Sequence, residues 1–350
     1  MRLGLAASAV GARIRKAAAL RVMVVGGTRF IGAAIVEELA DHGHELLLVH
    51  RGEHEPDDLP EADHLHTERA SLPHLRGAVD DFGPEGVVDT YAMTAADAET
   101  ALAAIGDDAR LLVLSSMDVY RAYGSLLAGV ETEPVPIDET APVRERRYPY
   151  RGHPTLGSMP IAEQYEKLDV EEAYLRRGAT VCRLPMVYGE RDGQRREEPI
   201  LGRLRAGRER IPVGEGSFLW TRGYVRDVAS GVRLALESEA TIGEVLNLGE
   251  SRTWSMGLWA RHVLEAAGGG AELVRVPDPL LPEDLRLLGH VSQHLLVDSG
   301  KARDLLGWTE TDPHEALHRS VAWHQAHPPE TPADFTADDS ALAAAGARGA

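Results

Sequence analysis

The sequence predicts an α/β protein with a Rossmann-type, doubly wound parallel sheet and a smaller composite substrate domain toward the C-terminus. Two observations predict this fold class. Apolar runs of strand length alternate with stretches whose apolar residues recur at helical spacing. A glycine-rich turn also joins the first of these runs to the first helix. With 43% apolar residues among 350, the chain can fill a large buried core.

The first fifty residues predict a βαβ unit. Residues 21–25 form a short run rich in β-branched side chains, and the turn GGTRFIG follows it. Residues 33–43 have apolar side chains at helical spacing and end in glycine, which is a common helix stop. Residues 45–50 are again apolar. The two strands are therefore expected to lie parallel, with a right-handed crossover.

The same alternation continues along the chain. Further buried strands are expected at residues 86–93, 110–116, 179–189 and 244–249. Helices are expected at residues 95–106, 160–178 and 225–238.

The alternation weakens in two later stretches, where glycine, proline and charged residues become more frequent. These stretches, residues 191–224 and 251–326, are expected to form the substrate-binding part. Residues 21–190 are expected to bind the dinucleotide, and residues 225–250 return to that domain. Both ends, residues 1–20 and 327–350, lack a clear apolar pattern and are expected to be disordered.

Charge and cysteine content limit the classes of partner. The net charge of −18 disfavours simple attraction to nucleic acid or to anionic membranes, so neither is expected as a partner. No apolar stretch reaches the length of a membrane span. The single cysteine, Cys182, lies in an apolar run and is expected to be a buried strand thiol. These features predict a cytoplasmic protein.

The turn after the first strand is the expected dinucleotide site. Glycine lets the backbone approach a pyrophosphate, and the following helix offers free amides and the positive end of its dipole. Gly26 and Gly32 fill the outer positions of a G-x-x-G-x-x-G pattern, whereas its middle position holds Arg29. The residues expected to bind the cofactor here are Gly26, Gly27, Thr28, Arg29, Phe30, Ile31 and Gly32.

The residue after the second strand bears on the choice of cofactor. An acidic residue near this place accepts the ribose hydroxyls of NAD, but this chain has Arg51. Guanidinium binds a 2'-phosphate through charge-assisted hydrogen bonds, which favours NADP. Because Glu53 and Glu55 lie close by, the expected cofactor is NADP or NAD.

Several separated segments together resemble the extended short-chain dehydrogenase/reductase family, in particular its NAD-dependent epimerase/dehydratase branch. Besides the glycine turn, they are LSSMDVY at 114–120, RLPMVYG at 183–189, RGYVRDVA at 222–229, VLNLGE at 245–250 and VDSGKARDLLGW at 297–308. The resemblance covers about residues 21–326. It implies hydride exchange between nicotinamide and a sugar-like carbinol, with nucleotide-linked sugars as common substrates. It also implies a possible homodimer through two helices of the Rossmann domain.

The resemblance implies a serine, a tyrosine and a lysine as the active-site residues. Ser116 falls at the serine position, and Lys167 resembles the lysine that binds the nicotinamide ribose and lowers the tyrosine pKa. The tyrosine is missing from its usual place, four residues before the lysine, where this chain has Glu163. The nearest tyrosine, Tyr165, is two residues before Lys167, and in a regular helix it would face away from it.

Four alternatives remain open for the acid/base. Glu163 replaces the tyrosine, or Tyr165 acts because the helix begins irregularly after Pro160. Tyr148 or Tyr150 supplies the phenol from the preceding loop, or the site has lost its chemistry and retains only the cofactor. The competing functions are therefore an enzyme and a non-catalytic dinucleotide-binding sensor or scaffold.

Two further motifs have a bearing on ligands. Arg222 and Arg226 stand where family members often contact a substrate phosphate. His314 and His318 complete an H-E-x-x-H pattern, which is typical of zinc helices. That pattern lies in an amphipathic C-terminal helix, so solvated histidines are the expected explanation and no metal is expected.

Overall fold

A single parallel sheet of seven strands forms the larger part of the molecule. The computed structural model describes residues 19–153, 160–286, 293–331 and 333–346. The strands of the seven-stranded sheet are β1 (Arg21–Val25), β2 (Glu45–His50), β3 (Asp63–His66), β4 (Gly86–Asp89), β5 (Arg110–Ser116), β6 (Thr180–Leu184) and β10 (Val245–Asn247). Their order is β10-β6-β5-β4-β1-β2-β3, and all neighbouring pairs are parallel. The order reverses between β1 and β4, where open α/β sheets bind their ligands.

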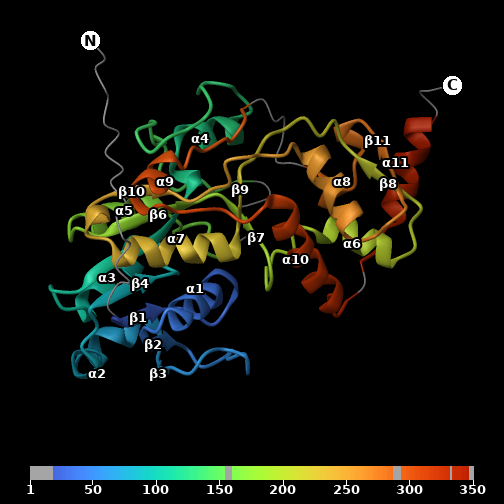
Figure 1. Cartoon of the computed structure of the whole chain (residues 1–350). Coiled ribbons are helices and arrows are strands. Elements are labelled where there is room, and N and C mark those ends of the chain that lie inside the picture. The colour runs from blue at the N-terminus through green and yellow to red at the C-terminus, as the bar shows by residue number, and fades with distance from the viewer. Residues whose placement is uncertain (1–18, 154–159, 287–292, 332, 347–350) are drawn as a thin grey trace, which may run out of the picture.

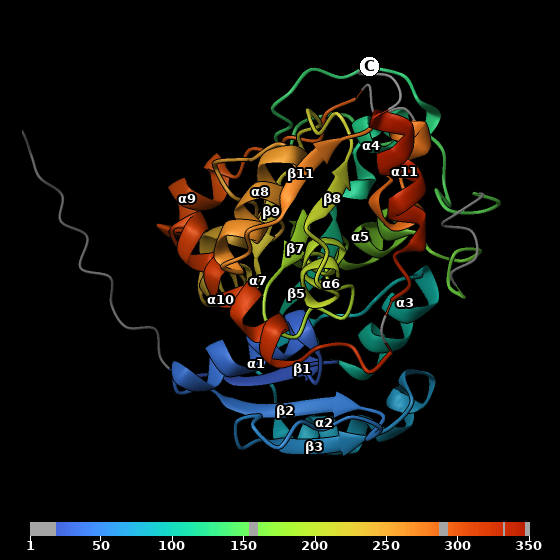
Figure 2. The ribbon, with the colours of Figure 1, turned by 90° about the vertical axis from the view of Figure 1, so that its right-hand side faces the viewer.

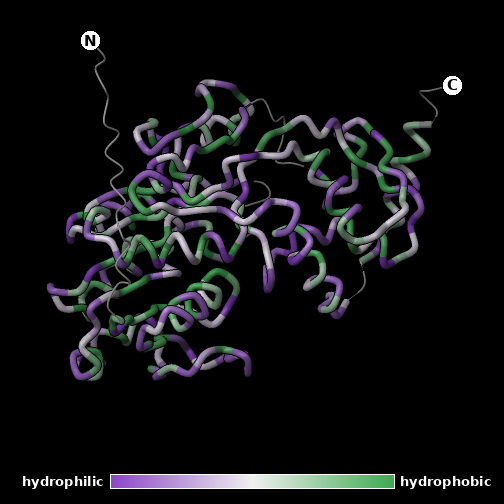
Figure 3. Tube along the Cα trace, in the orientation of Figure 1, coloured by the Kyte–Doolittle hydropathy of each residue, from purple (hydrophilic) through white to green (hydrophobic). Residues whose placement is uncertain are grey.

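Helices cover both faces of this sheet (Figure 1). One face packs against α1 (Phe30–Asp41) and α7 (Val225–Glu237), and the other against α2 (Arg76–Phe82), α3 (Ala95–Ala104) and α5 (Lys167–Leu175). In β1, Val22 and Val24 face the first layer, while Met23 and Val25 face the second. The helices mix hydrophilic and hydrophobic residues along their length (Figure 3). The predicted Rossmann-type α/β fold is confirmed.

A smaller lobe lies to one side of the sheet, on the right of Figure 1. It contains α6 (Glu198–Arg205), β8 (Arg210–Val213), α8 (Met256–Ala266), β11 (Glu272–Arg275) and α11 (Thr336–Gly346), and α10 (Pro313–Ala326) packs against α8. Strands β8 and β11 pair in parallel. The remaining elements are η1 (Arg69–Leu75), η2 (Met117–Val119), α4 (Arg121–Ala128), β7 (Met186–Tyr188), β9 (Arg222–Tyr224), η4 (Glu239–Thr241), η5 (Asp278–Leu280), η6 (Glu283–Leu285) and α9 (Gly300–Leu306).

The strand expected over residues 179–189 is in fact two strands. It divides at Pro185, which has no N–H to donate to a sheet. Strand β6 stays in the large sheet, whereas β7 pairs with β9 in a separate ladder.

The helix expected over residues 160–178 begins only at Lys167. Glu166 caps it, because its carboxylate accepts the Leu168 N–H and also pairs with the buried Arg144 guanidinium at 2.6 Å. Turns occupy residues 160–164.

The prediction of a disordered tail at residues 327–350 is wrong for the helical segment α11. Asp338 in this helix is fully buried and pairs with Arg203, which is equally buried in α6. A buried guanidinium requires such a partner, and the sequence pattern does not reveal a contact between residues so far apart. The expected extension at residues 1–20 lies almost wholly outside the described residues. Among the described residues, no helix is long and apolar enough to cross a membrane.

Candidate active site

The glycine turn after β1 has a backbone that only glycine adopts easily. Gly26 and Gly27 have φ angles of 103° and 97°. A Cβ on Gly26 would lie 2.2 Å from the Thr90 hydroxyl oxygen. A Cβ on Gly32 would lie 2.8 Å from the Gly27 backbone nitrogen. The first turn of α1 therefore packs directly against the glycine turn, with no room for side chains between them.

This turn fits the pyrophosphate of a dinucleotide. The first turn of α1 holds no acidic residue, and its N-cap residue, Arg29, forms no side-chain hydrogen bond to the helix amides. The amides and the positive end of the helix dipole are thus available to an anion. Thr28 is nearly buried beside them, whereas Arg29 is exposed. The positions of Thr28, Arg29, Phe30 and Ile31 at the turn agree with the sequence expectation, but their contacts to a cofactor stay predictions.

Arg51 follows β2 at the same edge of the sheet. Its guanidinium is half-exposed and lies 2.8 Å from the equally exposed carboxylate of Glu53. An exposed ion pair of this kind contributes at most about 1 kcal/mol. Glu53 is therefore a weak competitor for Arg51, which stays available to a ribose phosphate.

Lys167 lies at the centre of the carboxyl edge of the sheet. Its buried ammonium donates hydrogen bonds to the carbonyls of Ala92 at 2.6 Å and Leu114 at 3.0 Å, beside β4 and in β5. Burial lowers the pKa of Lys167 to about 8, although Asp89 and Asp118 favour its charged form. At neutral pH Lys167 is therefore mainly protonated and carries a positive charge at this edge of the sheet.

Tyr165 reaches the same region because α5 has not yet begun at that residue. Its buried phenol donates a 2.7 Å hydrogen bond to Oδ2 of Asp118 and lies within hydrogen-bonding reach of Ser116. Ser116 ends β5, and its hydroxyl accepts the Asp118 N–H at 3.2 Å. The structure thus brings Tyr165 to Ser116 and Asp118, and the charge of Lys167 acts on the same Asp118 carboxyl group.

Asp118 is the functional candidate that sequence reasoning missed. Its Oδ2 also accepts a 2.7 Å hydrogen bond from the Tyr150 phenol, while its buried Oδ1 has no partner among the described residues. Burial raises the pKa of Asp118. Burial and the negative charge of Asp118 together raise the pKa of Tyr165 well above 10.0. The only signal in the sequence was the place of Asp118 between Ser116 and Tyr120 in LSSMDVY.

Two of the residues considered as acid/base lie outside this group. Glu163 is two-thirds exposed and pairs with Arg151 at 3.4 Å. The same Arg151 guanidinium lies over the Tyr148 ring, 4.0 Å from its centroid. Neither side chain faces Asp118, so the geometry favours Tyr165 and Tyr150 over both.

The two arginines expected at a substrate phosphate differ in burial. Arg222 is buried over the Trp259 ring, donates to the Trp254 carbonyl at 3.1 Å, and has an Nε without a partner among the described residues. Burial lowers its pKa to about 10. Arg226 is half-exposed and pairs with Glu190 at 3.2 Å. Both roles stay predictions, and only Arg226 faces solvent.

Asp89 has a structural partner, and the histidines of the H-E-x-x-H motif lie at the surface. Asp89, at the end of β4, is buried in a two-pronged ion pair with Arg69. In the H-E-x-x-H motif, His314 and His318 are exposed on α10. Within the described part of the chain, these histidines belong to no group of three or more side chains that could hold a metal ion.

Comparisons with known proteins agree with this fold. Residues 22–249 match the model of the NAD dependent epimerase/dehydratase family. The chain is 25% identical to the chloroplast stem-loop binding protein of 41 kDa b from Arabidopsis thaliana, over 92% of this chain and 84% of that protein. It is 26% identical to 2'-dehydrokanamycin reductase from Streptomyces kanamyceticus, over 76% of this chain and 72% of that protein.

Solved structures share the fold at low sequence identity. The UDP-glucose 4-epimerase of Thermotoga maritima, solved with UDP-glucose, has a TM-score of 0.64 at 20% identity, covering 88% of this chain and 99% of that one. The dTDP-glucose 4,6-dehydratase of Bacillus anthracis, solved with NAD, has a TM-score of 0.67 at 16% identity, covering 88% and 97%.

Proposed function

Because the chain belongs to the NAD-dependent epimerase/dehydratase family, we propose that it transforms a sugar-like carbinol, most simply that of a nucleotide-linked sugar. The observation that supports this function is the group formed by Ser116, Asp118, Tyr165 and Lys167 at the carboxyl edge of the sheet. The names of the solved neighbours, which include a UDP-glucose epimerase and a dTDP-glucose dehydratase, support the same substrate class.

Each side chain of this group has a distinct task in the proposal. A nicotinamide dinucleotide, held by the glycine turn and by Lys167, would supply the hydride-transfer chemistry. Ser116 orients the substrate hydroxyl, and the phenolic oxygen of Tyr165 takes up the proton of that hydroxyl. The phenol can accept it because the phenolic proton passes along the 2.7 Å hydrogen bond to Oδ2 of Asp118. Lys167 holds the nicotinamide ribose and stabilises negative charge that develops on the phenol.

Paired variants test this assignment. We expect Tyr165→Phe and Lys167→Met each to lower kcat by about 100- to 10,000-fold, since each removes a group from the proton transfer or from its charge stabilisation. The matched controls are Tyr148→Phe and Lys301→Met, because both of those side chains lie outside the group. The assay follows a panel of nucleotide sugars with NAD or NADP, and products are identified by NMR. Equal rates in Tyr165→Phe and Tyr148→Phe would contradict the assignment.

The identity of the cofactor has its own measurement. Purified protein is denatured, and any released dinucleotide is identified by mass spectrometry. Near-stoichiometric NAD favours an epimerase or dehydratase that recycles a retained cofactor, and it excludes the proposed role of Arg51 toward a 2'-phosphate. An empty site that then binds NADPH favours a reductase with an exchanging cofactor.

One observation favours the second candidate function, a sensor or scaffold that binds the dinucleotide without turnover. The Tyr165 phenol is already engaged by a carboxylate that raises its pKa, which opposes formation of a phenolate. For such a protein, dinucleotide binding is saturable, no sugar in the panel reacts, and Tyr165→Phe leaves the binding unchanged.

The proposal also covers where the protein is found in the cell and whether it forms a dimer. The buried Cys182, whose pKa burial raises to about 12, supports an inert thiol and a cytoplasmic protein. Helices α3 and α5, which pack against each other on one face of the sheet, stay the predicted surface of a homodimer.

A further inference from the structure

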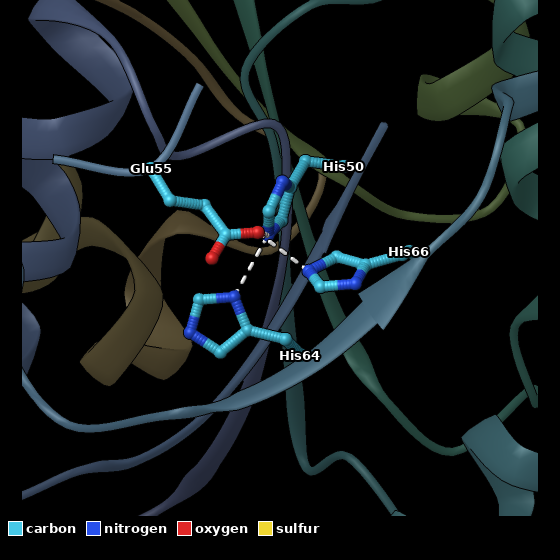
Figure 4. A group of neighbouring side chains, drawn as sticks. All are labelled: His50, Glu55, His64 and His66. Atoms are coloured by element: carbon cyan, nitrogen blue, oxygen red, sulfur yellow. Dashed lines mark hydrogen bonds and ion pairs between the residues drawn. The ribbon is translucent and has the colours of Figure 1, made fainter. Parts of the chain in front are cut away.

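Three histidines and one glutamate converge beside the edge of the sheet (Figure 4). His50 is the last residue of β2, while His64 and His66 lie in the edge strand β3. Because side chains alternate along a strand, His64 and His66 project from the same face of β3. Glu55 comes from the loop that joins the two strands. One potential ligand atom from each of the four lies within 4.8 Å of all the others.

The distances suit a small cation between the four side chains. His50 Nε2 is 2.8 Å from His64 Nδ1 and 3.7 Å from Glu55 Oε1, which is itself 2.6 Å from His66 Nε2. A tetrahedral zinc ion with bonds of about 2.0–2.1 Å places its ligand atoms roughly 3.3 Å apart. The present separations lie on both sides of that value, so small side-chain rotations would complete the site.

The orientation of the rings also distinguishes this cluster from a stack of histidines. The ring planes are steeply inclined to one another, at 77° for two pairs and 62° for the third. One ring nitrogen of each histidine points toward a common centre, as Figure 4 shows. His50 is 9% exposed, whereas the other three side chains of the cluster are open to solvent.

A hydrogen bond to the other ring nitrogen of His50 bears on how this side chain could bind a metal. The Gly52 N–H donates to Nδ1 of His50 at 3.1 Å, so the neutral ring carries its proton on Nε2. Coordination through Nε2 requires this proton to move to Nδ1, and the Gly52 amide must then turn away.

We propose that His50, Glu55, His64 and His66 bind one divalent transition-metal ion of the zinc class. Three imidazoles and one carboxylate form a nitrogen-rich donor set that suits zinc, cobalt, nickel or copper and disfavours magnesium or calcium. Because the protein supplies all four ligands, the site is structural and leaves no position for a substrate. The ion would join the edge strand β3 to β2 and to the loop that begins with Arg51.

Metal binding is measured on the full chain without an affinity tag, after removal of metal by chelation. We expect wild-type protein to take up one equivalent of Zn²⁺ by elemental mass spectrometry. With Co²⁺ we expect the intense visible absorption of a tetrahedral site. The double variant His64→Ala/His66→Ala should bind at least about 100-fold more weakly, since even second-shell partners of a metal are worth about 10- to 100-fold.

Two control variants make the result specific to this cluster. His54→Ala removes an exposed histidine next to Glu55 that is not among the four, and it should bind like wild type. His314→Ala/His318→Ala tests the H-E-x-x-H helix and should also leave binding unchanged. Since His64 and His66 are exposed, their loss should leave the circular dichroism spectrum as in wild type. No uptake by wild type, or equal uptake by the His64/His66 double variant, would overturn the proposal, whether or not the protein turns over a sugar.

Discussion

Asp118 couples two buried phenols through one carboxylate oxygen. Oδ2 accepts from Tyr165 and from Tyr150, both at 2.7 Å, whereas Oδ1 is buried without a partner in the described part of the chain. An unpaired buried carboxylate oxygen is costly, and such groups persist mainly where they have a task. Here the carboxylate raises the pKa of the Tyr165 phenol and is at the same time the nearest acceptor for its proton.

We therefore expect Asp118→Asn to change the shape of the pH–rate profile as well as its height. In wild type, kcat should rise with pH as Asp118 ionises, at a pKa that burial raises above 3.8. In the variant this limb disappears. The rate then rises only at alkaline pH, where the phenol ionises unaided. The measurement is kcat against pH. The control is Asp107→Asn, which changes an exposed carboxylate far from the phenols. An unchanged profile in Asp118→Asn would exclude the proton transfer to Asp118.

At the scale of elements, contacts between distant residues set the boundaries that the sequence pattern does not reveal. The glycine turn, Ser116 and Lys167 could be placed from the sequence because each depends on local geometry or on a motif. The start of α5 could not, because the ion pair between Glu166 and Arg144 fixes it from 22 residues away. That late start brings Tyr165 to Ser116. A continuous helix would have turned it away.

Strand β3 and helix α11 escaped prediction for related reasons. Strand β3 is only DHLH, with polar residues on an exposed edge, so it lacks the apolar run by which the other strands were found. Its alternating histidines were nevertheless visible and were a signal for the cluster with His50. Helix α11 has few large apolar residues. It is held by the pair between Asp338 and Arg203, which are 135 residues apart in sequence.

The attachment of α11 gives a stability prediction for that element. Asp338→Ala leaves the half-exposed Asp284 as the remaining carboxylate partner of the fully buried Arg203, so we expect the free energy of unfolding to fall by about 3 kcal/mol. Asp339→Ala is the matched control, because Asp339 is two-thirds exposed and pairs with Arg208 at the surface. It should cost less than about 1 kcal/mol. Denaturant unfolding measures both, and equal losses would show that the buried pair does not hold α11.

At the scale of the whole molecule, two buried carboxyl groups link stability to pH. Glu250 lies beside Arg222 and Tyr188, and Glu197 accepts a 2.7 Å hydrogen bond from Ser320 of α10. Burial raises the pKa of each from 4.5 to about 7. Between pH 4.5 and about pH 7, the folded protein therefore binds more protons than the unfolded chain. The contribution of these two carboxyl groups to the free energy of unfolding is complete below pH 4.5 and is lost as pH rises to about 7.

We accordingly expect Tm to fall between pH 5 and pH 7, and Glu250→Gln to flatten this fall. A pKa difference of this size corresponds to roughly 3 kcal/mol per group. Glu209→Gln removes the same charge at an exposed position, and its Tm should fall with pH as steeply as that of wild type. Thermal unfolding followed by circular dichroism across this range is the measurement. A slope in Glu250→Gln as steep as in wild type would show that Glu250 is not protonated in the folded protein.

The small lobe is assembled around a cation whose partners come late in the chain. In Figure 2, α11 lies at the opposite end of the molecule from β1, β2 and β3, which pair side by side. During synthesis Arg203 leaves the ribosome 81 residues before Asp284 and 135 residues before Asp338. The sheet strands through β6 can pair co-translationally, but the lobe must wait with an unpaired guanidinium and uncovered apolar surface. Uncovered apolar surface of this kind makes a partly synthesised chain prone to aggregation until its last third has been made.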